Sequence, residues 1–321
     1  MSTLDEILNE INKAKTIVIL THENPDGDAV GTALALYKQL KTMEKDVDLI
    51  IPKYSRCFEN LPGLNEAAIE KGTKEQYDLA ISVDAATIKL LNGWSNYFED
   101  ANEKIVIDHH STNSMYGDIN YVEYNSPACA QVMYEIFKYY NWNISIDVGT
   151  CLMTGIITDT GGFQYSGVSK QTFKIASELL EKGVNISKIY KQMLATHSRA
   201  NHELKRIALD RMEFLEDGKI AFTYITKKDE KKVKAETGDY EGIVNEGRNI
   251  EGVEVSIFIR EDDNDENYYK VSMRSSDYVN VSDVCLMFGG GGHIKAAGAT
   301  MHGTPKKLRD KIVAEVKRQL K

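Results

Sequence analysis

Aspartates and histidines, the residue types that bind divalent cations, gather in a few short motifs in the first half of the chain. The candidate functional residues are His22, Asp26, Asp28, Asp84, Asp108, His109, His110 and Asp159. Carboxylates and imidazoles favour hard to borderline divalent ions, and the lack of thiolates points away from structural zinc. So many ligands suit two ions roughly 3.5–4 Å apart that share one carboxylate. A hydroxide held between two ions is a nucleophile at neutral pH, so we expect a two-metal phosphoesterase.

Buried strands are expected to position these motifs. Apolar runs occur at residues 16–21, 47–51, 79–83 and 105–107, and helical patterns at 29–43, 128–140, 147–159 and 170–182. Strands that are apolar throughout, with helices between them, predict an α/β domain with a mostly parallel sheet flanked by helices. Ligands of such sheets bind beyond the carboxyl ends of the strands, where three of the motifs lie. Asp159, at the end of a helical pattern, would complete the site.

Each motif also has a purely structural interpretation. Asn24-Pro25-Asp26-Gly27 is a good turn sequence, Asp84 could cap a helix, and 108–110 could end a strand in a turn. An EF-hand is excluded because its twelfth position would be Tyr37 rather than glutamate. A haloacid-dehalogenase-type site is a weak alternative because Asp26 does not follow its strand directly, and the sequence contains no P-loop motif. Four motifs at equivalent topological positions favour one shared site over unrelated turns.

The pattern of apolar and polar residues changes in the second half of the chain. A polar helical stretch at 187–213 is interpreted as a linker, and strand patterns follow at 220–225, 253–260 and 268–274. The polar segment 261–266 predicts a hairpin turn, and the end of the chain predicts a helix that starts at Thr304 and Pro305. We therefore expect a catalytic domain over 1–186, a helical linker over 187–213 and a smaller α+β domain over 214–321.

A run of four glycines followed by His293 stands near the C-terminus. The run alone suggests a flexible joint, but an apolar segment precedes it and small residues follow it at helix-packing density. Such a loop can bring backbone N–H groups close to an anion at a helix N-terminus. His293 and Arg274 could add charge-assisted hydrogen bonds to a phosphate or carboxylate.

The overall composition limits the partners. The net charge of −9 argues against a protein that coats long nucleic acid, although bound cations would still allow a small anionic substrate. The four cysteines are far apart and indicate neither a disulfide framework nor a zinc site. The N-terminus does not resemble a signal peptide, and no apolar run reaches membrane-spanning length, so we expect a cytoplasmic protein that does not bind membranes.

Taken in order, these motifs resemble the DHH–DHHA1 phosphoesterases, in particular the stand-alone nano-RNase and 3′-phosphoadenosine 5′-phosphate phosphatase type. The resemblance covers nearly the whole chain, and Thr32 stands where these proteins often have serine. It implies two divalent cations, manganese above others. One cation would be held by His22, Asp26 and Asp84, and the other by Asp28, Asp84, His109 and Asp159. His110 would face the substrate phosphate, and Asp108 would orient the histidines. The substrate-binding residues would be Arg274, Gly290, Gly291, Gly292 and His293.

The resemblance also implies an activity, the hydrolysis of linear dinucleotides and other very short oligonucleotides to nucleoside 5′-monophosphates. It extends to 3′-phosphoadenosine 5′-phosphate as a second substrate, with a cleft between the domains limiting substrate length. The alternatives are an inorganic pyrophosphatase or exopolyphosphatase, and a catalytically silent nucleotide-binding module. The sequence leaves open the polarity of attack, the RNA or DNA preference and whether the chain forms a homodimer.

Overall fold

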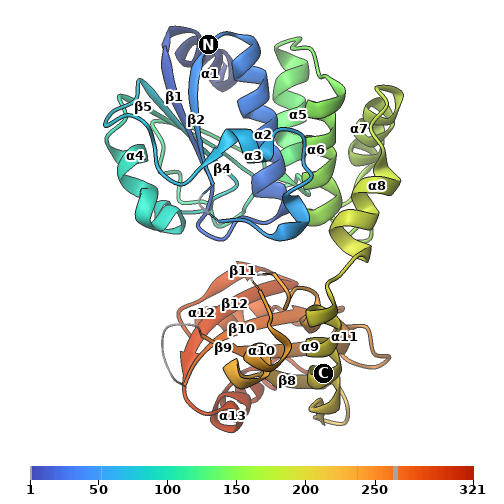
Figure 1. The fold of residues 1–321 in the computed structure, drawn as a ribbon. Helices are drawn as coiled ribbons and strands as arrows, with labels where there is room; N and C mark the ends of the chain where they lie inside the picture. Colours follow the sequence, from blue (N-terminus) through green and yellow to red (C-terminus); the bar gives the residue numbers. More distant parts are fainter. Residues whose placement is uncertain (1, 52, 237, 263–266) are drawn as a thin grey trace. The chain divides into compact units, whose positions relative to one another are not determined.

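The computed structural model describes residues 2–51, 53–236, 238–262 and 267–321. The chain divides into two compact units, one over Met1–Thr196 and the other over His197–Lys321 (Figure 1). The first is an α/β unit and the second is a smaller α+β unit, which confirms the predicted fold class.

The first unit begins with alternating strands and helices. Its first part contains α1 (Thr3–Lys13), β1 (Thr16–Leu20), α2 (Gly27–Thr42), β2 (Asp46–Ile50), η1 (Arg56–Phe58), α3 (Leu64–Ala67), β3 (Ala68–Ile69), β4 (Leu79–Val83), η2 (Ile88–Trp94) and α4 (Ser95–Glu99). Its second part contains β5 (Glu103–Asp108), β6 (Ile119–Val122), α5 (Cys129–Tyr139), α6 (Ile146–Asp159), α7 (Lys170–Glu181), α8 (Ile186–Tyr190) and the π-helical turn η3 (Lys191–Ala195).

All six strands of this unit form one parallel sheet in the order β3-β2-β1-β4-β5-β6. The chain runs outward from β1 in one direction through β2 and β3, then returns to the other side of β1 with β4. The strand order therefore reverses between β1 and β4, which is where open α/β sheets form a ligand-binding crevice. The pairing of Leu20 with Ser82 brings the ends of these two strands side by side.

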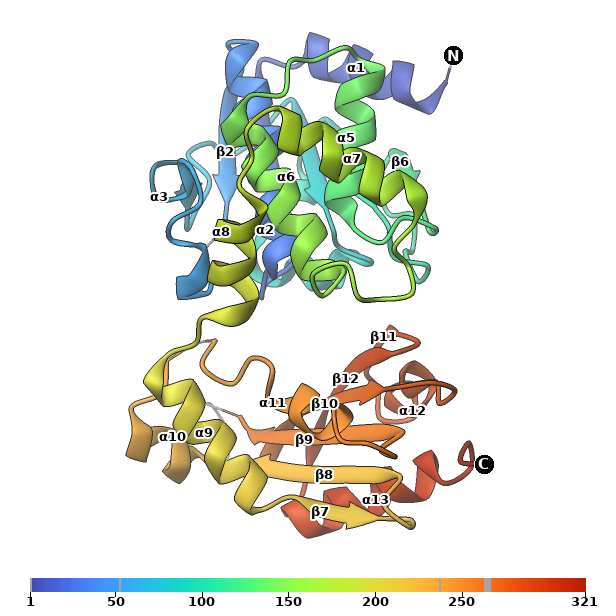
Figure 2. The same ribbon diagram turned by 90° about the vertical axis from the view of Figure 1, so that its right-hand side faces the viewer.

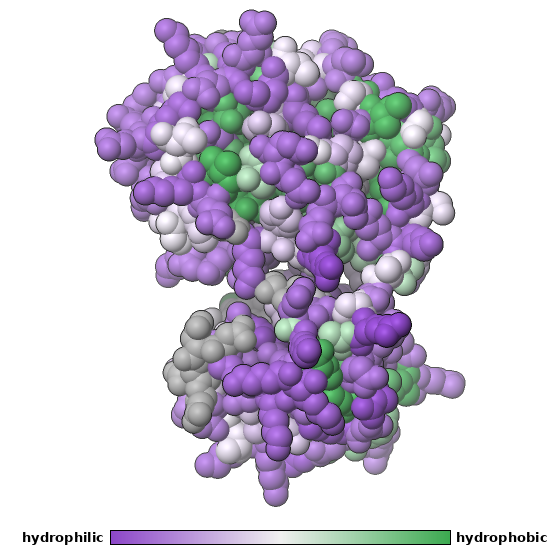
Figure 3. All heavy atoms as spheres, in the orientation of Figure 1, coloured by the Kyte–Doolittle hydropathy of each residue, from purple (hydrophilic) through white to green (hydrophobic). Residues whose placement is uncertain are grey.

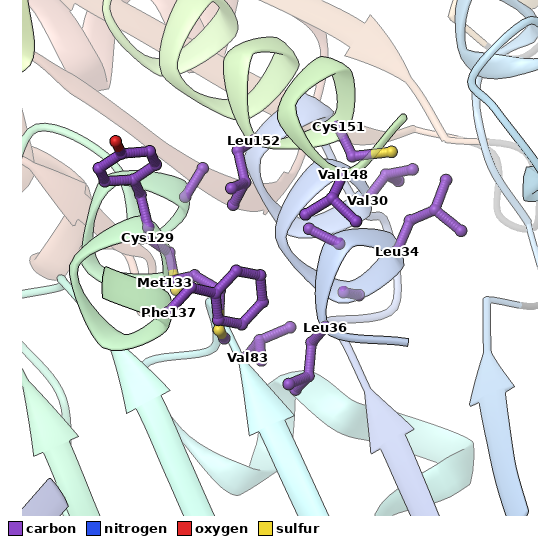
Figure 4. Close-up of a cluster of buried hydrophobic side chains, with 14 of the residues drawn as sticks. Val30, Leu34, Leu36, Val83, Cys129, Met133, Phe137, Val148, Cys151 and Leu152 are labelled. Atoms are coloured by element: carbon purple, nitrogen blue, oxygen red, sulfur yellow. The ribbon is translucent and has the colours of Figure 1, made fainter. Parts of the chain in front are cut away.

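Residues of β1, β2, β4 and β5 alternate between two separate cores. One face of the sheet packs against α1, α2, α5 and α6, with Ile19 and Ile81 among the buried side chains. Figure 4 shows this core, where Met133 of α5 and Leu36 of α2 lie beside Val83 of β4, and Leu152 of α6 lies farther from the sheet. The opposite face packs against residues of η2 and α4, including Phe98. Burial of both faces explains why the strands are apolar throughout.

Helices α2 and α6 approach closely because glycine lies between them. A Cβ on Gly155 of α6 would lie 2.5 Å from Asp28 Oδ1 and 2.5 Å from Ala130 Cβ, well inside normal contact. A Cβ on Gly31 of α2 would collide with the carbonyl oxygen of Cys151. The glycines thereby allow two helices that carry predicted functional residues to meet.

The second unit starts with α9 and contains a mixed sheet (Figure 2). Its elements are α9 (Arg199–Asp210), β7 (Glu213–Leu215), β8 (Ile220–Ile225), α10 (Lys227–Val233), α11 (Ile243–Arg248), β9 (Val255–Glu261), β10 (Tyr268–Ser275), α12 (Val281–Leu286), β11 (Gly291–His293), β12 (Ala296–His302) and α13 (Pro305–Val316). The strand order is β11-β12-β10-β9-β8-β7, and only β8 and β9 pair in parallel. Residues of α12 and α13 pack in one core of this unit, and residues of α9 and α11 in a second.

One prediction for this unit is confirmed and another is wrong. β9 and β10 pair antiparallel, as predicted for a hairpin, and most of the predicted turn at 261–266 lies outside the described residues. The small residues after the glycine run were expected at helix-packing spacing, and this was wrong. Ala296–His302 is a strand that pairs with both β10 and β11, so the glycine run is part of a sheet edge and does not open a helix.

The face drawn in Figure 3 is largely hydrophilic, with hydrophobic residues in small groups on it. Cys129, Cys151 and Cys285 are buried as free thiols in α5, α6 and α12. Across the described ranges, no helix combines the length and the apolar character needed to span a bilayer.

Candidate functional site

The turn between β1 and α2 holds the first motif. Asp26 caps α2, since its Oδ1 accepts hydrogen bonds from the backbone N–H groups of Asp28 at 2.9 Å and Ala29 at 3.1 Å. The motif therefore also has the structural role that its turn sequence suggested, because Asp26 starts α2. The cap fixes the carboxyl group of Asp26 at the exposed end of the sheet. His22, which is half-buried, lies two residues beyond β1.

Asp28 is buried and anchored to a second helix. Its Oδ2 accepts from the N–H of Cys129 at 2.5 Å, and its Oδ1 accepts from the N–H of Ala130 at 2.9 Å and the hydroxyl of Thr32 at 3.2 Å. The carboxylate thus satisfies two N–H groups in the first turn of α5, where the helix dipole favours negative charge. Two carboxylate oxygens offer about four acceptor positions. Three are used, which leaves acceptor capacity on Oδ2, the oxygen 3.9 Å from His109 Nε2.

Asp84 follows β4 in a strained conformation. Its φ of 55° is left-handed, and its N–H donates to the carbonyl of Ile107 at 3.1 Å. The side chain is buried, and its Oδ1 has no hydrogen-bond partner among the described residues. Burial alone would raise the pKa of Asp84, but the neighbouring His109, His110 and His22 outweigh burial and lower it. An ionised carboxylate with an unsatisfied buried oxygen is what a shared metal ligand requires.

His109 is oriented by the backbone. Its Nδ1 lies 3.0 Å from the carbonyl oxygen of Ser126, and because a carbonyl only accepts, Nδ1 carries the proton. Nε2 consequently faces the carboxylates, at 3.4 Å from Asp84 Oδ1 and 3.4 Å from Asp159 Oδ2. Burial disfavours the imidazolium, but these carboxylates raise the pKa of His109 well above its usual value. A proton on Nε2 and a metal ion are alternative ways to offset this negative charge.

His110 is oriented by Asp108. Its Nδ1 lies 2.7 Å from Oδ1 of Asp108, which is fully buried and also accepts from the N–H of His109 at 2.8 Å. Burial disfavours the charged imidazole, but the hydrogen bond with Asp108 and the charges of Asp84 and Asp108 raise the pKa of His110. The side chain of His110 is 23% exposed, so it can be reached by a ligand.

Among the described residues, several groups of possible ligand atoms lie close together, and two of them consist of predicted metal ligands alone. Those of His22, Asp26 and Asp84 lie within 4.8 Å of one another, and so do those of Asp28, His109 and Asp159. Burial and the neighbouring carboxylates raise the pKa of Asp28 well above its usual value, and they raise that of Asp159 to about 7 although His109 opposes the shift. The set is therefore short of positive charge. Its oxygen and imidazole donors, the unsatisfied oxygen of Asp84 and the preset Nε2 of His109 fit divalent cations.

The predicted substrate-binding residues lie in the second unit. Arg274 of β10 pairs with Ala296 of β12, which pairs with His293 of β11. The three residues occupy one row across the sheet and share a face, with a small side chain between the two larger ones. A Cβ on Gly290 would lie 2.7 Å from Ala299 Cα, so this glycine is required for strand pairing.

Gly291 and Gly292 differ in their surroundings. Gly292 has a φ of 141° and approaches the backbone of β12, whereas a Cβ on Gly291 would meet no described atom within 4 Å. The fold therefore requires Gly292 but gives no steric reason for glycine at 291.

Sequence reasoning missed three groups that hold the site. These are the carbonyl of Ser126, the N–H groups at the start of α5 and the amide of Asn113, which donates to Asp108 at 2.6 Å. None of them belongs to a recognisable motif, because each acts through a backbone atom or a single contact in the folded chain.

Known proteins resemble this chain along most of its length. Residues 16–156 match the DHH family, N-terminal domain, and residues 217–321 match the DHHA1 domain. The chain is 29% identical over 300 residues to the bifunctional oligoribonuclease and PAP phosphatase NrnA of Thermus thermophilus, covering 89% of this chain and 84% of that protein. It is 28% identical to the protein of the same name from Mycoplasma genitalium, over 98% of this chain and 96% of the relative.

A solved structure has the same fold along nearly the whole chain. It is an exopolyphosphatase-related protein from Bacteroides fragilis, with a TM-score of 0.89 and 28% identity over 98% of this chain and 96% of that one. The DHH match comes first along the chain and the DHHA1 match second, as the sequence motifs predicted. The two matches show that this chain belongs to the DHH–DHHA1 family.

Proposed function

We propose that this protein is a metal-dependent phosphodiesterase that hydrolyses very short oligonucleotides, such as linear dinucleotides, to nucleoside 5′-monophosphates. The observation that carries the proposal is the pair of ligand groups with the buried, unsatisfied Asp84 beside both of them. The names of the relatives, oligoribonuclease and PAP phosphatase, support the same substrate class. We extend the proposal to 3′-phosphoadenosine 5′-phosphate as a second substrate.

We assign one cation to His22, Asp26 and Asp84, and the other to Asp28, Asp84, His109 and Asp159, with Mn²⁺ as the preferred ion. Bound cations would activate a water molecule and neutralise charge on the phosphoryl group. Hydrolysis forms a bond from the water oxygen to phosphorus and breaks the bond to the 3′-oxygen, which takes a proton. We assign His110 to the substrate phosphate, because Asp108 fixes its Nδ1 and the side chain is exposed enough to reach a ligand.

The second unit is proposed to bind the part of the substrate that does not react. Arg274 and His293 lie in one row and offer donors to a phosphate. Of the three glycines assigned to substrate binding, Gly290 and Gly292 bring this segment close to β12, and Gly291 leaves the backbone beside it open. The net charge of −9 favours a short substrate over a long strand.

A side-by-side turnover assay with Mn²⁺ tests the proposal. The substrates are diadenylate, an oligomer of about a dozen nucleotides (longer than one short-strand site), 3′-phosphoadenosine 5′-phosphate and pyrophosphate. We expect rapid release of AMP from diadenylate and slow action on the oligomer. Rapid cleavage of pyrophosphate with inert diadenylate would overturn the proposal in favour of a pyrophosphatase. Tight nucleotide binding without turnover would indicate a silent binding module.

A further inference from the structure

Asn113 lies in the loop between β5 and β6 and contacts the ends of two neighbouring strands. Its side-chain amide donates to Asp108 Oδ2 at 2.6 Å and to the carbonyl of Ala85 at 3.3 Å. Its side-chain oxygen accepts from the N–H of Met115 at 2.7 Å, and its own N–H donates to the carbonyl of His110 at 3.1 Å. The side-chain amide of Asn113 therefore holds the segments that follow β4 and β5, and its side-chain oxygen holds its own loop.

The contact with Asp108 matters most because of where Asp108 is. Its carboxylate is fully buried, and Oδ1 accepts from the N–H of His109 and from Nδ1 of His110. Oδ2 accepts from Asn113. Without Asn113, a buried carboxylate oxygen would lose a strong donor, and the carboxylate could rotate to find another. His110, which hydrogen-bonds to the same carboxylate, would turn with it.

The contact with Ala85 is supported by a second residue. Tyr116 donates to the same carbonyl at 3.0 Å, and the N–H of Ser114 donates to the carbonyl of Ala86 at 2.9 Å. These bonds hold the backbone directly after Asp84, whose left-handed φ needs such support. When Asn113 is replaced, Asp84 retains these other contacts, so the predicted effect falls on His110.

We propose that Asn113 is a positioning residue, which fixes the orientation of His110 toward the substrate by holding Asp108. The inference rests on the proposed function for its catalytic consequence, but the orientation of His110 can be measured without turnover. In the wild type, Asp108 keeps Nδ1 of His110 protonated and directs Nε2 away from it.

Two variants separate positioning from general structural support. Asn113→Ala removes every side-chain bond, whereas Asn113→Asp keeps the size and the acceptor for Met115 but places a carboxylate against Asp108. If Asn113 merely supports the loop, the alanine variant is the more damaged one. If it positions Asp108, the aspartate variant is worse, because like charges face each other across a short distance. The matched control is Asn120→Ala, which removes bonds to Gly117 in the same loop, at 2.8 and 3.0 Å.

We expect kcat with diadenylate to fall about 10–100-fold in both Asn113 variants, more in Asn113→Asp, with KM and calorimetric Mn²⁺ affinity unchanged. Asn120→Ala should keep the wild-type kcat. Long-range proton–nitrogen NMR spectra of the metal-free protein should show a proton on Nδ1 of His110 in the wild type. In the Asn113 variants, the distribution of protons between the two ring nitrogens of His110 should change. Unchanged protonation of the His110 ring nitrogens, or a larger loss of kcat in Asn113→Ala than in Asn113→Asp, would overturn the inference. Failure of the wild type to cleave diadenylate would refute the proposed function alone, since the spectra would still decide the role of Asn113.

Discussion

The close approach of α6 to Asp28 gives a quantitative prediction for Gly155→Ala. In an exposed helix this substitution would stabilise the protein by about 1 kcal/mol, because alanine has the higher helix propensity. Here the added Cβ would lie 2.5 Å from Asp28 Oδ1 and 2.5 Å from Ala130 Cβ. Neither group moves easily, because Asp28 is bound to the backbone of α5 and Ala130 belongs to that helix.

The expected cost has two parts. Overpacking of a dense core costs about 1–3 kcal/mol, and disturbing the two bonds from Asp28 to the N–H groups of α5 costs about 1 kcal/mol each. After the gain in helix propensity is subtracted, the net destabilisation is about 2–4 kcal/mol. A shifted Asp28 should also weaken Mn²⁺ binding about 10–100-fold, as for other disturbances around a metal ligand.

Gly149→Ala is the matched control in the same helix. A Cβ there would meet Val184 Cγ2 at 2.9 Å and Leu179 Cδ2 at 3.1 Å, which are methyl groups at the ends of side chains that can rotate away. It gains the same propensity but does not touch the site. Urea unfolding of the EDTA-treated variants and calorimetric titration with Mn²⁺ measure both effects. Equal stability and equal Mn²⁺ affinity in the two variants would refute the reasoning.

Three further outcomes are expected. Asp84→Asn should lower turnover more than about 100-fold and reduce Mn²⁺ binding, and a variant with full metal-dependent turnover would contradict the shared-ligand role. Gly291→Ala should raise KM without changing the free energy of unfolding. Gly290→Ala should lower the free energy of unfolding by about 1–3 kcal/mol, measured by thermal unfolding, because a Cβ at 290 collides with β12 and one at 291 does not. Equal stabilities of the two variants would refute this prediction. Although burial opposes it, hydrogen bonds from Arg211 and Thr226 lower the pKa of Asp229 from 3.8 to about 2. The lowered pKa contributes about 2 kcal/mol of stability, which is present above pH 4 and lost as the pH falls toward 2. The urea midpoint of Asp229→Asn should therefore depend less on pH across that range than that of the wild type. An unchanged pH dependence would refute the prediction.

The strands of the first unit could be predicted because both of their faces are buried. Short, continuous apolar runs such as 79–83 are typical of strands covered on both sides, and the residues after them must lie at one edge of a parallel sheet. The same logic placed Asp84 and Asp108 near each other. It could not identify β6, whose residues are only partly buried and lack a continuous apolar run.

The failure at the glycine run has a different cause. A sequence such as Ala296-Ala297-Gly298-Ala299 contains no large side chain whose spacing distinguishes a helix from a strand. What decides the outcome is pairing with β10 and β11, where small residues permit close backbone contact. Contacts between residues far apart in sequence, such as that of Asp28 with Cys129, are likewise invisible to local patterns.

The bonds from Asp28 to α5 bear on how sequences of relatives are interpreted. A protein that had lost its chemistry would still need this carboxylate to cap a buried helix, so selection for folding alone would retain it. Asp84 is different, because its buried Oδ1 has no structural bond within the described part of the chain. In a diverged relative, an aspartate matching Asp28 therefore says little about activity, whereas replacement of the one matching Asp84 marks the loss of it.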